Sequence, residues 1–382
     1  AKRILKVALI VVAAVVVIVG AYVVYVVATY SRIADHEKLA VNTDVYSGAA
    51  SYELLKTGEE YTAFTYNIGF GAYDHDYSFF MDTGAMADGT ETAGKSSRAA
   101  SKDAAAHNTE LVTSAVLSEM PDIALFQEVD VKADRSYDVD QRGVILDAMD
   151  TYYGREGGVN WTFASNFHSA YLFYPPTKPI GKISESGLLT VSHYTIGTSM
   201  RWSYPVSDAF PTKFFDLDRC FTVNRMPVTD DAGAPAGDLV LINTHMSAYD
   251  KGGTIRREQM KLLGEVIANE YELGNWVIVG GDFNHAIGGS ENKFMNGMQR
   301  PPWVEAFAED QLPEHFRMVI ADNADTVATD RDTSIPYTKG VNYEVTLDGF
   351  IVSDNVKASS ENIDTDYEAS DHNPVKLKFS LQ

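Results

Sequence analysis

The stretch "VIVGGDFNHAIG", residues 277–288, joins an apolar run to a group of polar side chains. Its β-branched residues predict a buried strand, which leads through two glycines to Asp282, Asn284 and His285. An ordinary turn explains the same residues, because Gly, Asp and Asn are common where a chain leaves a strand. The alternative is that the glycines let the backbone turn sharply and so present the polar groups to a ligand.

Five other segments combine an apolar run with polar residues in the same way. They are "YTAFTYNIGF" (61–70), "DIALFQEVD" (122–130), "DLVLINTHMSAYD" (238–250), "VTLDGFIVSD" (345–354) and "SDHNPVKLKFSL" (370–381). Their polar residues are Asn67, Glu128, His245, Asp348, and Asp371 with His372. Any one of these is most simply a cap or turn residue. Together, carboxylates, carboxamides and imidazoles form a complete set for hydrolytic chemistry.

Helical and extended patterns alternate along the chain. Residues 101–120 place apolar side chains on one helical face until Pro121 ends the pattern, and residues 143–153 and 254–272 predict further amphipathic helices. Many short strands lie between them, most followed by a polar cluster. This order predicts an α/β (α+β) domain in which two packed sheets are flanked by helices and the polar clusters gather at one edge.

The first thirty residues differ from the rest. Val7 to Tyr30 contains no charged side chain, and a helix of that length covers about 36 Å, enough to cross a bilayer. A cleavable signal peptide is the alternative, although its apolar core is usually shorter. We therefore predict an anchor at 1–30, in contact with lipid through residues 4–30, a linker at 31–58 and a catalytic domain at 59–382. Basic residues before the span place the N-terminus in the cytosol and the domain outside the cell.

Composition restricts the partners. The net charge is −22, which disfavours nucleic acid because polyanion-binding proteins usually carry a basic face. Cys220 is the single cysteine, so an internal disulfide is excluded. An external domain held only by its own core suits a bacterial surface. Nothing in the sequence indicates a protein partner.

The motifs resemble those of the endonuclease/exonuclease/phosphatase superfamily of metal-dependent phosphoesterases. The resemblance rests on "TYNIG" (65–69), "QEVD" (127–130), "INTHMSA" (242–248), "GGDFN" (280–284), "LDGFIVS" (347–353) and "SDHNPV" (370–375), which occur in the family's order. It implies a four-layer α/β/β/α sandwich of two mainly antiparallel sheets. It also implies in-line attack of an activated water on phosphorus.

The resemblance assigns a role to each polar residue. Glu128, Asn67 and Asp371 are implied as metal ligands, and their oxygen atoms suit Mg²⁺, Mn²⁺ or Ca²⁺. Asp282 would activate the water, while Asn284 would hydrogen-bond a phosphate oxygen. His245 and His372 would stabilise the developing charge, with Asp348 orienting His372. Gln127 and Asn243 are expected to be structural.

Two positions depart from the family's pattern. Gly349 stands where the family commonly has an aromatic residue, so different local packing is expected. Asp130 stands where deoxyribonuclease-like members tend to have an arginine that meets the DNA backbone. A carboxylate there would repel a polyanion, so the hypothesis of a nuclease becomes less favoured.

Three hypotheses follow for function. The first is a surface-anchored phosphodiesterase or phosphatase acting on phospholipid, by analogy with bacterial sphingomyelinase-like members; the second is an extracellular nuclease; the third is a non-catalytic binding module. Aromatic residues at 73–82 and 169–179 would touch lipid or ligand if exposed, but a core role is favoured.

Overall fold

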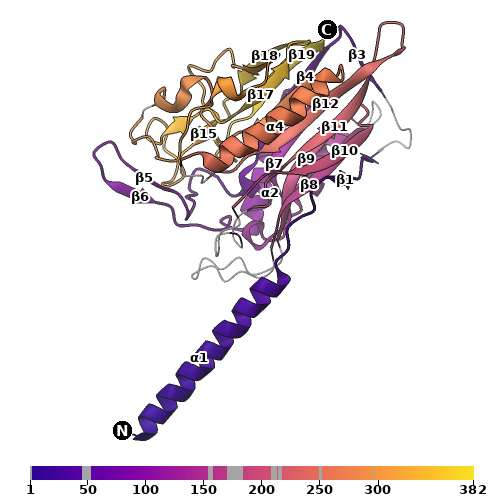
Figure 1. Ribbon diagram of the computed structural model, residues 1–382. Helices are drawn as coiled ribbons and strands as arrows, with labels where there is room; N and C mark the ends of the chain where they lie inside the picture. Colours follow the sequence, from indigo (N-terminus) through magenta and orange to yellow (C-terminus); the bar gives the residue numbers. More distant parts are fainter. Residues whose placement is uncertain are drawn as a thin grey trace.

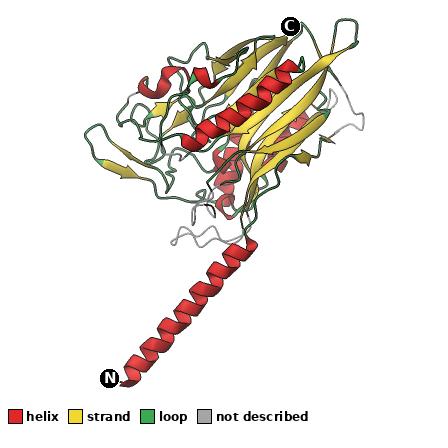
Figure 2. Cartoon of the chain, viewed as in Figure 1, coloured by secondary structure: helices red, strands yellow, loops and turns green. Residues whose placement is uncertain are grey.

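The computed structural model describes residues 2–44, 53–153, 158–169, 184–207, 213, 217–248, 252–294 and 296–382. Two large sheets lie face to face, with helices on their outer sides (Figures 1 and 2). The four-layer sandwich predicted from the sequence is therefore confirmed. The aromatic segment at 170–179 lies outside the described residues.

The first sheet has the strand order β18-β19-β4-β7-β9-β8-β2. Its neighbours are antiparallel except for β4 and β7, which are parallel. The strands are β2 (Asn42–Asp44), β4 (Glu60–Asn67), β7 (Ile123–Lys132), β8 (Val159–Ser169), β9 (Ser184–Ser192), β18 (Val356–Asn362) and β19 (Val375–Leu381).

The second sheet has the order β1-β10-β11-β12-β13-β17-β14, and β3 also pairs with β11. The pairs β12–β13 and β3–β11 are parallel and the others antiparallel. The strands are β1 (Glu37–Leu39), β3 (Leu55–Lys56), β10 (Thr198–Ser203), β11 (Cys220–Thr229), β12 (Pro235–His245), β13 (Trp276–Asp282), β14 (Phe316–Val319) and β17 (Asp348–Ser353).

Three apolar layers hold the sandwich together. The layer between the sheets contains Leu125, Leu241, Ile278, Phe350 and Leu377, all fully buried. The helices α2 (Lys102–Ser118) and α3 (Gln141–Tyr153) pack on the first sheet, and α4 (Thr254–Glu272) packs on the second. Each helix covers a sheet face with one apolar stripe, as its sequence periodicity predicts.

Two short ribbons complete the fold. The hairpin β5 (Thr83–Ala85) and β6 (Glu91–Ala93) projects from the domain in Figure 1, while β15 (Asp330–Arg331) pairs with β16 (Glu344–Val345). Both lie in segments for which the sequence shows little periodicity. The second ribbon places Asp330 next to His372 through an isolated bridge.

The N-terminal helix α1 (Lys2–Thr29) extends away from the domain (Figure 1). None of its residues is buried, and its length and apolar composition make it a candidate membrane span. The expectation of a polar linker at 31–58 does not hold for residues 37–44, because β1 pairs with β10 and β2 pairs with β8. These strands are short and polar, so their sequence gives no alternation by which to predict them.

Candidate active site

Strand register gathers three of the polar residues into one row. His245 pairs with Asp282 across β12 and β13, and Asp282 pairs with Asp348 across β13 and β17. Directly paired side chains lie about 5 Å apart on a sheet. Residues that are 37 and 66 positions apart in the chain therefore become neighbours through backbone pairing alone.

The two glycines of "GGDFN" serve packing rather than a turn. Both lie inside β13, where a Cβ on Gly280 would fall 2.5 Å from the Phe350 ring and a Cβ on Gly281 would fall 2.0 Å from the Thr244 carbonyl oxygen. The expectation that they form the sharp turn is wrong. The chain changes direction at Asn284, whose φ of +51° is left-handed, a conformation that asparagine tolerates better than most residues.

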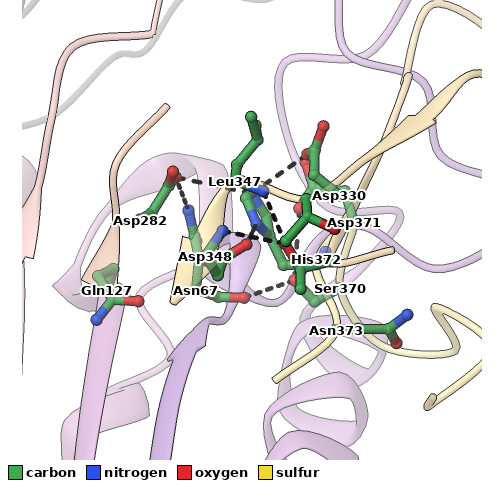
Figure 3. Close-up of polar contacts among 12 residues, drawn as sticks. Asn67, Gln127, Asp282, Asp330, Leu347, Asp348, Ser370, Asp371, His372 and Asn373 are labelled. Carbon is green, nitrogen blue, oxygen red and sulfur yellow. Dashed lines mark hydrogen bonds and ion pairs between the residues drawn. The ribbon is translucent and has the colours of Figure 1, made fainter. Parts of the chain in front are cut away.

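Asp282 accepts three hydrogen bonds from two asparagines, and Figure 3 shows its link to Asn67. Its Oδ2 accepts hydrogen bonds from Asn67 Nδ2 at 3.1 Å and Asn284 Nδ2 at 3.2 Å, and its Oδ1 accepts one from the Asn284 amide at 2.8 Å. Burial, reinforced by the nearby charge of Asp348, raises the pKa of Asp282 to about 7. A carboxylate with this pKa suits proton transfer at neutral pH.

His372 is held between carboxylates. Its Nδ1 lies 2.8 Å from Asp348 Oδ2, while its Nε2 lies 3.5 Å from Asp330 Oδ1 and 3.9 Å from Asp282 Oδ2. Burial alone would lower the pKa of His372, but the charges of Asp348 and Asp330 outweigh it and raise the pKa well above its usual value. These carboxylates therefore favour the charged, imidazolium form of His372.

The pKa of His245 is shifted in the opposite direction from that of His372. Its Nε2 lies 3.4 Å from Asp282 Oδ2 and 4.0 Å from Glu128 Oε1, and its Nδ1 makes no hydrogen bond to any described residue. Burial, together with the positive charge of Arg219, lowers the pKa of His245 well below its usual value. The site thus favours a neutral imidazole at His245 and a charged one at His372.

Glu128 enters the cavity from a strained position on β7. Its φ is +58°, and the pairing of β7 with β9 shifts register between Phe126 and Val129. Such bulges re-aim side chains, and a left-handed conformation at a non-glycine residue costs about 1–3 kcal/mol. The Glu128 side chain keeps 23% of its surface exposed. The bulge therefore presents a solvent-accessible carboxylate.

Asp371, Glu128 and Asn67 all line the cavity. Burial raises the pKa of Asp371 to about 6; the charge of His372 opposes this shift and the charge of Glu128 contributes to it. A Cβ on Gly69 would lie 2.8 Å from Asp371 Oδ1, so only glycine permits this approach. Mutual repulsion between two carboxylates is what a bound divalent cation relieves.

Two further groups of ligand atoms lie close together. The ligand atoms of Asp282, Asp348 and His372 lie within 4.8 Å of one another, as do those of Asp330, Asp371 and His372. Asp348 Oδ1 is buried without a hydrogen-bond partner in the described part of the chain. This concentration of oxygen donors fits a hard divalent cation.

The polar groups line a cavity of about 300 Å³. Of the residues expected from the sequence, the cavity wall includes Asn67, Glu128, His245, Asp282, Asn284, Asp371 and His372, and Asp348 lies directly behind His372. Apolar side chains also line the cavity, among them Phe70, Tyr73, Phe79, Phe80, Phe167 and Trp303. Within the segment 73–82, Tyr73 and Tyr77 are buried core residues, whereas Phe79 and Phe80 are partly exposed.

The expected role of Asp130 is wrong. Its side chain is fully buried and faces Arg135, whose Nη2 lies 2.8 Å from Asp130 Oδ1 and whose Nε donates to Asp130 Oδ2 at 3.0 Å. Arg135 lines the cavity, 4.0 Å from Glu128 Oε2, and its guanidinium lies 3.9 Å from the centre of the Phe70 ring. The carboxylate therefore positions a cation instead of repelling a polyanion.

Sequence reasoning missed Arg135 and Asp330. Arg135 lies seven positions after Glu128. The signal available in the sequence was an arginine close enough to "QEVD" to pair with one of its carboxylates. Asp330 belongs to the two-residue strand β15, where no pattern distinguishes it from other surface acids. Burial raises the pKa of Asp330 well above its usual value, although His372 opposes the shift.

Gln127 and Asn243, expected to be a structural residue and a strand-end hydrogen bonder, contact each other. Both are fully buried, and Gln127 Nε2 donates to Asn243 Oδ1 at 2.8 Å, which joins the two sheets beneath the cavity. At Gly349, a Cβ would lie 3.2 Å from Ile287 Cδ1 and 3.6 Å from Met318 Sδ, so these side chains occupy the space beside this position.

The fold is a two-sheet sandwich whose cavity gathers carboxylates, carboxamides and imidazoles, the set of groups expected of a hydrolase. The family model described as Endonuclease/Exonuclease/phosphatase family matches residues 64–372. The chain belongs to this family and is a metal-dependent hydrolase acting on phosphoric ester bonds. The recognition made from the sequence motifs is confirmed.

Solved structures agree on the fold. An endonuclease/exonuclease/phosphatase from Beutenbergia cavernae is similar with a TM-score of 0.51 and 16% identity, over 84% of this chain and 72% of that one. ANGEL2, a 2′,3′-cyclic phosphatase, in complex with adenosine-2′,3′-vanadate, is similar with a TM-score of 0.50 and 13% identity, over 90% and 99% respectively. No curated protein matches the chain significantly.

Proposed function

We propose that this chain is a membrane-anchored phosphoesterase whose catalytic domain lies outside the cell and which hydrolyses a phospholipid ester. The observation that carries the catalytic part is the position of Asp282. Two asparagines hold this carboxylate 3.4 Å from a neutral His245 and 3.9 Å from a charged His372. A water molecule placed here has a base on one side and hydrogen-bond donors on the other.

Each side chain has a definite task in this proposal. Asp282 takes a proton from the water. The oxygen of that water attacks phosphorus, and the bond from phosphorus to the leaving oxygen breaks. Asn284 orients a phosphoryl oxygen, and the two histidines donate hydrogen bonds to the oxygens on which negative charge builds. Asp348 keeps His372 protonated and oriented.

Glu128, Asp371 and Asn67 would hold the metal ion, and we propose Mg²⁺, with Mn²⁺ or Ca²⁺ as alternatives. A divalent cation supplies neutralisation of phosphoryl charge and polarisation of the phosphorus centre. Arg135 adds a fixed positive charge at the same wall of the cavity.

Two observations support a lipid substrate. The helix α1 is long and apolar enough to span a bilayer, and the cavity is lined by apolar as well as polar side chains. The net charge of −22 opposes a nucleic-acid substrate, although Asp130 no longer contributes to that argument. A non-catalytic binding module is disfavoured because the whole set from Asn67 to His372 surrounds one cavity.

The test uses detergent-solubilised full-length chain with bis(p-nitrophenyl) phosphate, sphingomyelin micelles and plasmid DNA. We expect Mg²⁺-dependent hydrolysis of the first two, loss of hydrolysis with EDTA, and loss in Asp282→Ala. Asp231→Ala, an exposed carboxylate in the distant β11–β12 turn, is the matched control. Preferential cleavage of plasmid would reverse the ranking of substrates, and no metal-dependent turnover of any substrate would reject catalysis.

A further inference from the structure

The residues that follow α1 are fastened to the catalytic domain. Arg32 Nη1 lies 2.8 Å from Asp218 Oδ1, and the Ile33 amide donates to Asp218 Oδ2 at 3.1 Å. Arg201, which is fully buried, donates through Nη1 to the Ala34 carbonyl oxygen at 3.0 Å. We call residues 31–34 with these partners the anchor clamp.

The anchor clamp adjoins the cavity wall. Asp218 stands between Leu217 and Arg219, and both of these line the cavity. On the other side, Ser31 Oγ lies 3.1 Å from Nε2 of His168, the residue after the cavity-lining Phe167. Consecutive Cα atoms are about 3.8 Å apart, so the clamp and the cavity share the same stretches of backbone.

The membrane surface lies close to this clamp if α1 spans the bilayer. The apolar stretch ends at Tyr30, and Arg32 is the first charged residue after it. Two residues reach at most about 7 Å. A chain that is clamped so soon after leaving the membrane leaves the domain little freedom to rotate or move away.

The geometry points to a fixed orientation, in which the anchor clamp holds the cavity against the surface of the bilayer that α1 crosses. The enzyme then hydrolyses headgroup phosphoesters in the leaflet from which its own anchor emerges. This inference rests on the proposed function and assigns the substrate to the same membrane. The negative net charge favours zwitterionic over anionic headgroups, because an anionic surface would repel the domain.

The test reconstitutes the full-length chain in vesicles of phosphatidylcholine and sphingomyelin, mixed with enzyme-free vesicles carrying deuterated sphingomyelin. Mg²⁺ added outside activates only outward-facing domains. Mass spectrometry of the released headgroups gives the hydrolysis rate in the enzyme's own vesicles and in the others. We expect the first rate to exceed the second by at least tenfold.

Two variants separate the clamp from simple tethering. Insertion of twelve Gly and Ser residues between Tyr30 and Ser31 keeps the anchor but frees the clamp from the membrane, and Asp218→Ala loosens the clamp itself. We expect each to lower the own-vesicle rate several-fold while hydrolysis of bis(p-nitrophenyl) phosphate stays unchanged. Asp231→Ala is the control and should change neither rate.

The outcomes distinguish the two proposals. Equal rates in both vesicle populations, or an own-vesicle rate that the insertion leaves unchanged, would overturn the fixed orientation. Activity on bis(p-nitrophenyl) phosphate without activity on either vesicle population would also overturn it, while leaving the phosphoesterase function intact. Absence of activity on the soluble diester would reject the proposed function itself.

Discussion

The two sheets contribute opposite kinds of chemistry to the cavity. The second sheet provides the base half, His245, Asp282 and Asp348, in which strand register and hydrogen bonds already fix the side chains. The acidic half consists of Asn67 at the end of β4, Glu128 in β7 and Asp371 just before β19. Carboxylates repel each other in both halves, but those of the base half also accept hydrogen bonds from Asn67 and Asn284 or contact His372. The comparison teaches that hydrogen bonds hold the carboxylates of the base half, whereas in our proposal a cation holds those of the acidic half.

The largest effect is expected in the base half. Asp282→Asn keeps the shape but removes the proton acceptor, so kcat on bis(p-nitrophenyl) phosphate should fall by roughly 10³-fold. Added Mg²⁺ should not restore it, because the metal ligands are intact. Asp231→Asn is the control. Recovery of activity at high Mg²⁺ would show that Asp282 acts mainly as a metal ligand.

A smaller loss is expected in the acidic half. Glu128→Gln removes one charged ligand, so activity at low Mg²⁺ should fall by about 10²-fold and partly recover at high Mg²⁺. Titration of activity against Mg²⁺ measures this shift, with Glu265→Gln on the exposed face of α4 as the control. An unchanged Mg²⁺ dependence would remove Glu128 from the cation site.

The contact between Asp348 and His372 predicts a change in how activity depends on pH. Asp348→Asn removes the charge that keeps His372 protonated, so the pKa of His372 should fall towards its usual value. Activity should drop about tenfold, and more at pH 8 than at pH 6. The pH profile of kcat checks this, because damage to the fold alone would lower activity equally at both pH values.

The smallest effect concerns stability. The pKa values of Asp282 and Asp371 are raised to about 7 and 6 from an ordinary 3.8, so the folded state binds protons more tightly than the unfolded chain. Without divalent cations, stability should therefore fall as pH rises from about 4 to 7.

Saturating Mg²⁺ should counter this loss by binding the ionised carboxylates. We expect it to raise Tm by about 3 °C at pH 8 and by much less at pH 5, measured by calorimetry. Glu128→Gln should reduce the increment at pH 8. An equal increment at both pH values would contradict the linkage between the acidic half and the cation.

The residues of both halves could be picked out from the sequence for one reason. Their residues sit at or near the ends of strongly apolar strands, so the positions are visible before the pairing is known. Asp330 and β1 could not be predicted in this way, since their positions depend on contacts with residues far away in the chain. Asp130 was recognised as unusual, but its burial against Arg135 depends on a short turn after β7 that periodicity does not show.

The hydrogen bond from Asn67 of β4 to Asp282 of β13 crosses from one sheet to the other, and His372, in the loop that leads into β19, contacts Asp348 of β17. A slide of one sheet over the other would break these links while leaving each sheet intact. Mild heat or denaturant should therefore abolish turnover before the secondary structure melts. Catalysis in this molecule is a sensitive reporter of how well its two halves are aligned.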